Sequence, residues 1–329
     1  LDRIRATDAS LTAVAGRATV SVGTGATLEV LEQGAAVIAS VIFGTQAVTS
    51  GALDGVNLAL VVLVPLAAYE AVQVLPAAVI VLARVRESAA RVVEVIDAPD
   101  LTPDPDPAAP LPEPVPPAAL RVWDFVAGWA PEQWVAQPVS FDVAAGSSLA
   151  VVAPSGAGKS TVALGLARMV PTAGESAYGS VDLAAVTGDD ARRVVELVQQ
   201  DAHLFDTTIV ENIRLARRSA SDEEITAVLT DLGLGDWIAG LPKGIETRVG
   251  RFGRAVSGGQ RQRIAIARGL VAQAPVMIAD EPTEHLDAAN AEAVMAALRR
   301  HCRERVLVLI THNADQAAQC DQVVRLHPA

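Results

Sequence analysis

The stretch VVAPSGAGKST, residues 151–161, decides the fold of the larger part of this chain. Its apolar start is typical of a strand, and the rest fits the phosphate-binding loop G-x-x-x-x-G-K-[ST], except that Ala153 stands where the first glycine belongs. Glycines let backbone N–H groups turn toward a phosphate, and the next helix points its positive end at that anion. Because an alanine at the first position costs little if its φ is negative, we expect nucleotide binding to survive. The loop residues expected to hold the nucleotide are Pro154, Ser155, Gly156, Ala157, Gly158, Lys159, Ser160 and Thr161.

The residues on either side of this loop predict an α/β domain over residues 119–329. Apolar strands are expected at 149–153, 274–279 and 305–310, and helices at 160–169 and 287–300. Within the loop, Lys159 brings positive charge to the β- and γ-phosphates, and Ser160 offers a hydroxyl to Mg²⁺. Taken alone, the loop indicates only a P-loop nucleotide-hydrolysing protein.

A proline-rich stretch precedes this domain. Residues 99–117, PDLTPDPDPAAPLPEPVPP, contain nine prolines. Such a run favours an extended, polyproline-like conformation and acts as a spacer. We therefore expect a linker at residues 99–118, with a proline-rich docking motif as the alternative.

The region before the linker, residues 1–98, reads as the last part of a membrane domain. Residues 33–53 carry no charge and residues 57–83 carry a single one, Glu70, so each run is long enough for a span of ~20 residues. The basic residues lie outside both runs, which places both ends in the cytoplasm and makes the lipid bilayer an expected partner. The alternative is a buried helical hairpin of a soluble protein. A carboxylate at membrane depth is a candidate functional group, so Glu70 is expected either to meet cargo or to pair with another helix.

Composition narrows the class of protein further. The 329 residues are 51% hydrophobic and carry a net charge of −12, so we expect no nucleic-acid partner. The length suffices for two domains. Cys302 and Cys320 lack a metal-type spacing and are expected to be ordinary thiols. Because the chain starts at Leu1 and shows no signal peptide, we interpret it as a fragment without its natural N-terminus.

A second motif narrows the α/β domain to one family. SGGQRQR at residues 257–263 is followed by an apolar helical run, and Asp280-Glu281 closes a strand 23 residues after Ser257. Together with the phosphate loop and the later His312, this order of motifs resembles the ABC ATPase family over most of residues 120–329. The resemblance implies ATP and Mg²⁺ as cofactors and ATP hydrolysis as the activity.

The resemblance also implies a role for individual residues. Glu281 resembles the general base for the attacking water, and His312 resembles the switch histidine that contacts the γ-phosphate. Gln200 occupies the position of the glutamine that links Mg²⁺ and the attacking water to the membrane domain. Asp280, with Ser160 and Gln200, is expected to hold Mg²⁺.

Two more contacts with nucleotide follow from the same resemblance. Trp129 lies 30 residues before Lys159, where exporters of the family place an aromatic ring on adenine. Core packing is the alternative for Trp129, as it is for Trp123 and Trp134. In the family, the signature motif completes a site across a dimer interface. The residues expected to touch nucleotide bound to the partner subunit are Ser257, Gly258, Gly259 and Gln260.

Membrane helices followed by such a domain are typical of an exporter half-transporter, whose complete form has six spans, so four are expected upstream of Leu1. Three runs are similar to the CydC-type subunits of heterodimeric bacterial exporters required for cytochrome bd assembly: Asp280–Asp287, Val62–Pro76 and the segment LDRIRATDASLTAVAGRA. This resemblance implies a CydD-type partner, the bacterial inner membrane with a cytoplasmic ATPase domain, and export of a small thiol, cysteine or glutathione. Haem is the alternative cargo, although residues 1–100 contain neither His nor Cys.

Two readings from other classes stay open. One is a soluble ABC ATPase acting on nucleic acid, which the apolar runs and the negative charge disfavour. The other is a regulatory subunit with weak catalysis, suggested by Ala153. The chain also departs from the family after its acidic pair, where Glu284-His285-Leu286-Asp287 replaces Ser-Ala-Leu-Asp, and at Arg248 and Arg251, where acidic residues are usual.

Overall fold

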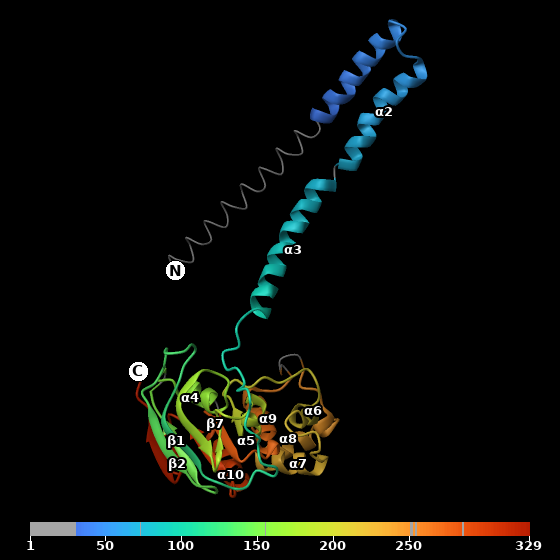
Figure 1. The fold of residues 1–329 in the computed structure, drawn as a ribbon. Helices are drawn as coiled ribbons and strands as arrows, with labels where there is room; N and C mark the ends of the chain where they lie inside the picture. The colour runs from blue at the N-terminus through green and yellow to red at the C-terminus, as the bar shows by residue number, and fades with distance from the viewer. Residues whose placement is uncertain (1–30, 73, 155, 251–252, 254, 285) are drawn as a thin grey trace. The chain divides into compact units, whose positions relative to one another are not determined.

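The computed structural model describes residues 31–329 except 73, 155, 251–252, 254 and 285. The chain divides into two compact units, residues 1–98 and 99–329 (Figure 1). The expectations for Ser155, Arg251 and His285, and for the segment LDRIRATDASLTAVAGRA, lie outside the described residues.

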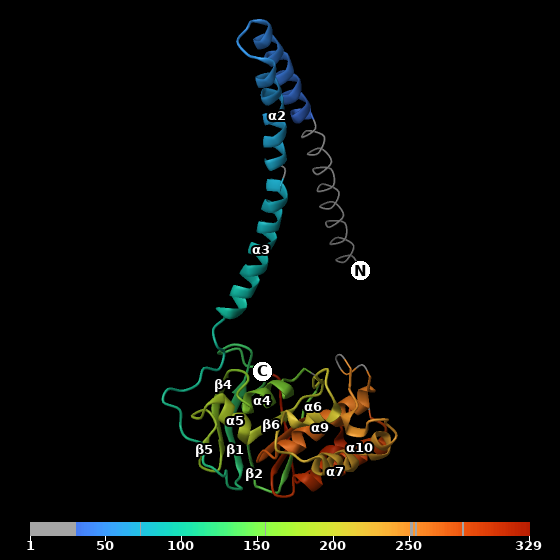
Figure 2. The same cartoon turned by 90° about the vertical axis from the view of Figure 1, so that its right-hand side faces the viewer.

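The first unit is a helical hairpin. A helix over Leu31–Thr49 is followed by α2 (Gly55–Val72) and α3 (Val74–Ile96). Figures 1 and 2 show the first helix running beside α2 in the opposite direction. Gly44 lies close to α2, since a side-chain carbon added there would lie 2.5 Å from Leu58 Cδ1.

These helices have the composition of membrane spans. Leu31–Thr49 and the helical stretch from Gly55 onward are long and apolar enough to cross a bilayer, with mean hydropathies of 1.3 and 2.1. The hydroxyls of Ser40 and Thr45 donate to carbonyls four residues earlier, both at 2.8 Å, so these polar groups are satisfied within the helix.

A parallel sheet forms the centre of the second unit. Its strand order is β6 (Val195–Val198), β7 (Val276–Asp280), β8 (Val306–Ile310), β3 (Ser148–Val152) and β9 (Gln322–Arg325). Every residue of β7 and β8 is buried, as expected for a parallel sheet covered on both faces. The three strands expected from the sequence are found as β3, β7 and β8, with ends shifted by at most two residues.

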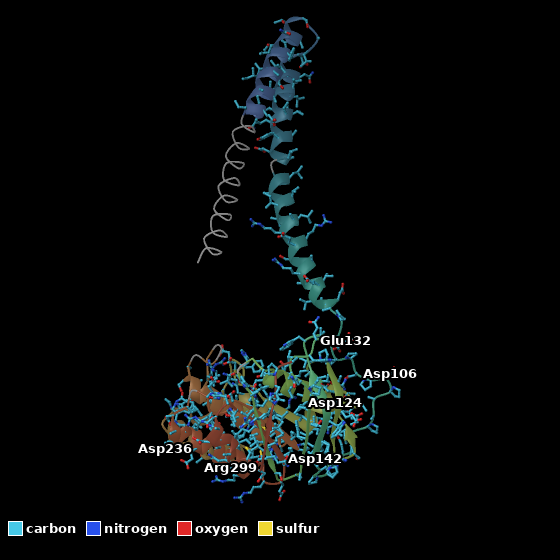
Figure 3. All side chains as sticks on the ribbon, turned by 90° about the vertical axis from the view of Figure 1, so that its left-hand side faces the viewer. Asp106, Asp124, Glu132, Asp142, Asp236 and Arg299 are labelled. Atoms are coloured by element: carbon cyan, nitrogen blue, oxygen red, sulfur yellow. The ribbon has the colours of Figure 1, made fainter. Side chains whose placement is uncertain are left out.

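An antiparallel sheet packs beside the parallel one. Its order is β2 (Val139–Val143), β1 (Leu120–Ala127), β4 (Thr172–Tyr178) and β5 (Val181–Asp182). The register of β1 shifts after Val122 against β2 and after Trp123 against β4, and Asp124 within this irregular stretch has a φ of 48°. Figure 3 labels Asp124 and also Asp142 on the neighbouring strand.

Helices cover the parallel sheet and complete two buried clusters. They are α4 (Lys159–Leu166), α5 (Gly188–Val194), α6 (Ile209–Arg214), α7 (Asp222–Asp231), α8 (Gly235–Ala239), the 3₁₀ turn η1 (Gly244–Glu246), α9 (Gly258–Ala272), α10 (Ala288–His301) and α11 (Ala314–Ala317). One cluster joins α4 to both sheets through Phe125, Leu149 and Leu166. The other joins α7 and α9 to the parallel sheet through Leu229, Ile264 and other apolar residues.

The two helices expected from the sequence are α4 and α10. Helix α4 ends at Leu166, three residues before the expected end, because Arg168 adopts a left-handed φ of 53° that does not continue a helix. Helix α10 begins after Asp287, whose carboxylate accepts the backbone N–H of Asn290 at 2.9 Å and caps the helix.

The parallel strands bring the motif residues to one edge of the sheet. Strands β3, β6, β7 and β8 are parallel neighbours, so their carboxyl ends lie together. The phosphate loop follows β3, Gln200 follows β6, Asp280 ends β7, and His312 follows β8. Ligands of open α/β sheets bind beyond this edge, so the topology places the candidate site there.

Candidate nucleotide-binding site

The phosphate loop is shaped by two glycines. Gly156 and Gly158 have φ values of 80° and 83°, which favour glycine and turn the backbone around the loop. Ala153 does not have a positive φ, so its methyl group causes no strain. This is the conformation in which we expect an alanine to cost little. The missing glycine therefore gives no structural reason to regard the loop as defective.

Lys159 spans the mouth of this loop at the start of α4. Its side chain is only 9% exposed, and Nζ donates to the Ala153 carbonyl at 2.8 Å and to the Pro154 carbonyl at 3.3 Å. Nζ also lies 3.8 Å from Glu281 Oε1. An ammonium held above such a loop is in place to bind phosphate oxygens.

Asp280 carries a buried oxygen that needs a partner. Its Oδ1 is buried and has no hydrogen-bond partner among the described residues. Burial raises the pKa of this carboxyl, and hydrogen bonding by Ser160 opposes that rise. A carboxylate and a hydroxyl at the phosphate loop are hard oxygen donors of the kind that Mg²⁺ prefers, so Asp280 and Ser160 fit the expected cation.

Glu281 is fixed by its backbone as well as by its side chain. Its φ is 49°, its N–H donates to the Ile310 carbonyl at 2.9 Å, and its carbonyl accepts from Gln262 Nε2 at 2.9 Å. The Oε2 atom lies 2.7 Å from His312 Nδ1. The structure therefore brings Glu281, His312 and Lys159 together, and the carboxylate is only 12% exposed.

Gln200 meets a residue that sequence reasoning did not assign to the site. Its side-chain Nε2 donates to Oε2 of Glu284. Gln200 also lines a cavity of about 260 Å³ together with Gly258 and Gln262. The signal that could have identified Glu284 is its carboxyl side chain where the family commonly has serine.

Trp129 belongs to a segment that borders the phosphate loop. Gly128 pairs with Trp134 in an isolated antiparallel bridge, and Val135 packs against Gly158, where an added side-chain carbon would lie 2.6 Å from Val135 Cγ2. Trp129 is 60% exposed and Trp123 is 68% exposed. Core packing is therefore wrong for these two rings, and Trp129 stays the predicted adenine contact.

The signature motif forms the start of α9. Ser257 Oγ accepts the backbone N–H of Gln260 at 3.2 Å, and Gln260 Oε1 accepts the backbone N–H of Ser257 at 2.8 Å, which makes a reciprocal capping box. Gly259 packs closely against Leu286. Among the described residues, no hydrogen bond or ion pair joins this motif to the phosphate loop of the same chain, so its contact with a partner's nucleotide stays a prediction.

Comparisons with known proteins agree with this geometry. Residues 136–284 match the family model described as ABC transporter, a family whose ATPase domain uses ATP with Mg²⁺. The chain is 38% identical over 204 residues to an ATM1-type heavy metal exporter of Novosphingobium aromaticivorans, covering 62% of this chain and 34% of that protein. It is 38% identical over 197 residues to the ATP-binding cassette sub-family B member 6 of Mus musculus, covering 60% of this chain and 23% of that protein.

A solved structure extends the likeness to both units. The structure of a bacterial Atm1-family ABC exporter with ATP bound matches with a TM-score of 0.70 and 29% sequence identity, covering 91% of this chain and 53% of that chain. The chain thus spans about a third or less of the length of those two curated relatives. The expected fold class is confirmed: a helical membrane segment is joined to an α/β ABC ATPase domain, as in Atm1-family exporters.

The same comparisons bear differently on the two resemblances seen in the sequence, one to ABC exporters in general and one to CydC-type subunits. Likeness to an ABC exporter half-transporter of the Atm1 and sub-family B type is confirmed. Likeness to CydC-type subunits in particular is not shown by these relatives, and it stays a proposal.

The strand leading to Gln200 holds an unusual carboxyl group. Burial raises the pKa of Glu196 in β6 to about 7, although the positive charge of Arg268 opposes the shift. Arg268, in α9, donates from Nη1 to the His203 carbonyl at 3.0 Å. A charge at Glu196 is therefore disfavoured in the folded protein.

We expect the contribution of Glu196 to the stability of the ATPase domain to fall as the pH rises from about 4.5 to 7, because the folded state keeps the Glu196 proton that the unfolded state releases. Glu196→Gln removes this decline. It should raise the free energy of unfolding at pH 8 by about 2–3 kcal/mol and leave it unchanged below pH ~4.5. Thermal unfolding of wild type and variant, measured at pH 8 and below pH ~4.5, checks this difference. The exposed Glu304→Gln is the matched control. Parallel pH profiles for wild type and Glu196→Gln would contradict it.

Proposed function

We propose that this chain is the ATP-binding and permease part of an ABC exporter, which hydrolyses ATP with Mg²⁺ and uses the energy to move a small molecule across a membrane. The observation that carries the proposal is the Glu281 carboxylate held between Lys159 and His312, at distances of 3.8 and 2.7 Å, beside the phosphate loop. In the same chain, apolar helices long enough to span a bilayer precede this site.

The residues divide the work of phosphoryl transfer, in which most of the catalysis is positioning and charge stabilisation. Lys159 exchanges the carbonyls of Ala153 and Pro154 for phosphate oxygens, which are stronger acceptors because they are charged. Glu281 accepts the proton of the attacking water, and His312 orients that carboxylate and contacts the γ-phosphate. Ser160, Asp280 and Gln200 would hold Mg²⁺, which would supply positive charge against the charge that develops on the phosphate oxygens.

A second half-transporter is part of the proposal. The residues Ser257 to Gln260 lie at the N-terminus of α9, where backbone N–H groups favour an anion. Head-to-tail closure of two ATPase domains would bring this motif to the nucleotide of the partner. Binding of ATP closes the pair, and hydrolysis opens it.

For the cargo, we propose a small thiol, cysteine or glutathione, exported across the bacterial inner membrane by a CydC-type subunit paired with a CydD-type partner. The run from Asp280 to Asp287 and the stretch Val62–Pro76 with Glu70 support this choice. Among the relatives, one is described as a heavy metal exporter, one as a mitochondrial iron–sulfur clusters transporter and one as a β-(1→2)glucan export protein. Metal-containing cargo, including haem, is therefore the alternative to test.

The ATPase rate with each cargo tests the proposal. The full-length subunit is co-expressed with its partner and reconstituted in lipid, and cysteine, glutathione and haem are added separately. We expect one thiol to stimulate hydrolysis, and the stimulation to vanish when Glu281 is replaced by glutamine. Stimulation by haem alone would replace the thiol by a metal-containing cargo, and equal rates in wild type and variant would assign hydrolysis to the partner's site.

A further inference from the structure

Glu284 is a carboxylate close to the acidic pair Asp280-Glu281, and its hydrogen bond is made to neither the phosphate loop nor His312. Its side chain is half-buried, and its Oε2 accepts a hydrogen bond from Nε2 of Gln200, 84 residues earlier in the chain. By contrast, Glu281 pairs with His312 and Lys159. Among the described residues, the hydrogen bond that the Glu284 side chain makes is to the proposed Mg²⁺ ligand Gln200.

The backbone around Glu284 is held in place from several sides. Its N–H donates to the Glu281 carbonyl at 3.1 Å. The side-chain hydroxyl of Thr283, just before it, accepts from Gln316 Nε2 at 2.6 Å. Leu286, just after residue 285, donates its N–H to the Thr283 carbonyl at 3.2 Å and packs against Gly259. The backbone that carries the Glu284 side chain is therefore anchored by hydrogen bonds to neighbouring residues.

The contact with Glu284 determines which end of the Gln200 amide faces the carboxylate. A glutamine side chain has a donor end, NH₂, and an acceptor end, C=O. A carboxylate only accepts, so Glu284 takes the donor end of Gln200 and leaves the carbonyl oxygen free. The carbonyl oxygen is the end that a hard cation prefers, and a hydrogen bond from a ligand to an outer carboxylate fixes its orientation and makes it more basic.

The Gln200 side chain borders a cavity, so its amide needs a partner to hold it in one orientation. Gln200 is exposed and lines the cavity of about 260 Å³ shared with Gly258 and Gln262. Without a fixed partner, the amide could rotate in this space and present its NH₂ group to a cation, which would be repelled. The contact with Glu284 removes that freedom.

We propose that Glu284 is a positioning residue that orients the Gln200 amide so that its oxygen faces Mg²⁺ at the ATP site. This inference rests on the proposed function, because it needs an ATP site at which Gln200 acts. Glu284 itself does not touch the nucleotide. It acts through Gln200, and its effect depends on the presence of the amide.

The test measures the Mg²⁺ dependence of ATP hydrolysis by the full-length subunit, assembled with its partner in lipid. Glu284→Ala is expected to raise the Mg²⁺ concentration for half-maximal activity about tenfold, the lower end of the effect of losing an outer-shell partner. ATP binding without Mg²⁺ should not change. In the Gln200→Ala background, adding Glu284→Ala should have no further effect, since the residue through which it acts is gone. The exposed Glu292→Ala is the matched control.

A reciprocal exchange makes the test independent of folding defects. Gln200→Glu alone places two carboxylates face to face, and Glu284→Gln alone leaves two amides without a set direction, so both should weaken the response to Mg²⁺. The double variant Gln200→Glu with Glu284→Gln restores a donor–acceptor pair and should recover most of it. A purely structural role for Glu284 would give no such recovery.

The outcomes separate this inference from the proposed function. Additive effects of Glu284→Ala and Gln200→Ala, or no recovery in the exchanged pair, overturn the positioning role while ATP hydrolysis at this site stands. A wild-type protein that binds no ATP, or a Gln200→Ala variant with normal Mg²⁺ dependence, overturns the assigned role of Gln200 and the inference with it.

Discussion

Replacing Lys159 by alanine is expected to abolish ATP binding at this site, with a loss of affinity of roughly 100-fold or more. The ammonium lies over the phosphate loop, where it donates to Ala153 and Pro154 and faces Glu281. Each charge-assisted hydrogen bond to a phosphate oxygen contributes about 1.5–3 kcal/mol, so losing one or two of them accounts for a change of this size. Alanine would also leave the Glu281 carboxylate without its nearby positive charge.

The chain offers a matched control, because Lys243 is its only other lysine. Lys243 is exposed and lies just before the turn η1. Equilibrium binding of a fluorescent ATP analogue should be lost in Lys159→Ala and retained in Lys243→Ala. Unchanged affinity in Lys159→Ala, with the partner's site blocked, would remove the phosphate loop as the nucleotide site.

The parallel sheet could be predicted from the sequence because its strands are buried on both faces. Strands β7 and β8 are continuous apolar runs, each ending next to a motif residue. The antiparallel sheet could not be read in the same way. Strand β1 breaks its alternation at the irregular stretch around Asp124, so its buried and exposed positions do not follow a period of two. Short helices such as α6 and α8 are too brief for a helical pattern to stand out.

The candidate site was predictable as a set of residues and not as a set of contacts. Motif order and the carboxyl edge of the sheet place Lys159, Asp280 and His312 together. Contacts such as Gln200 with Glu284, or Gln262 with the Glu281 carbonyl, join residues far apart in sequence through side-chain geometry. A one-dimensional pattern carries no signal for such pairs, although an unexpected carboxyl group at 284 points to a changed environment.

Replacing Glu281 by glutamine is expected to lower ATP turnover at this site by roughly 10²–10⁴-fold while ATP still binds, because the amide keeps the shape of the side chain and loses its ability to accept a proton. The geometry singles out this residue among the acidic groups. Its carboxylate lies 2.7 Å from His312 Nδ1, and its backbone is fixed by Ile310 and Gln262.

The distinctive outcome of Glu281→Gln is a retained nucleotide in a closed state, whereas a mere packing defect would release it. Single-turnover hydrolysis and trapping of labelled ATP, measured in the assembled exporter with the partner's site inactivated, distinguish the two. Glu292→Gln, on the exposed side of α10, should turn over normally. The variant removes the charge that Glu281 presents to Lys159 but leaves Asp280, Ser160 and the contacts of Lys159 with the Ala153 and Pro154 carbonyls in place. ATP binding is therefore expected to persist, while proton removal is lost. Full turnover in Glu281→Gln would therefore exclude it as the base and direct attention to His312 or to water-mediated proton transfer through the γ-phosphate.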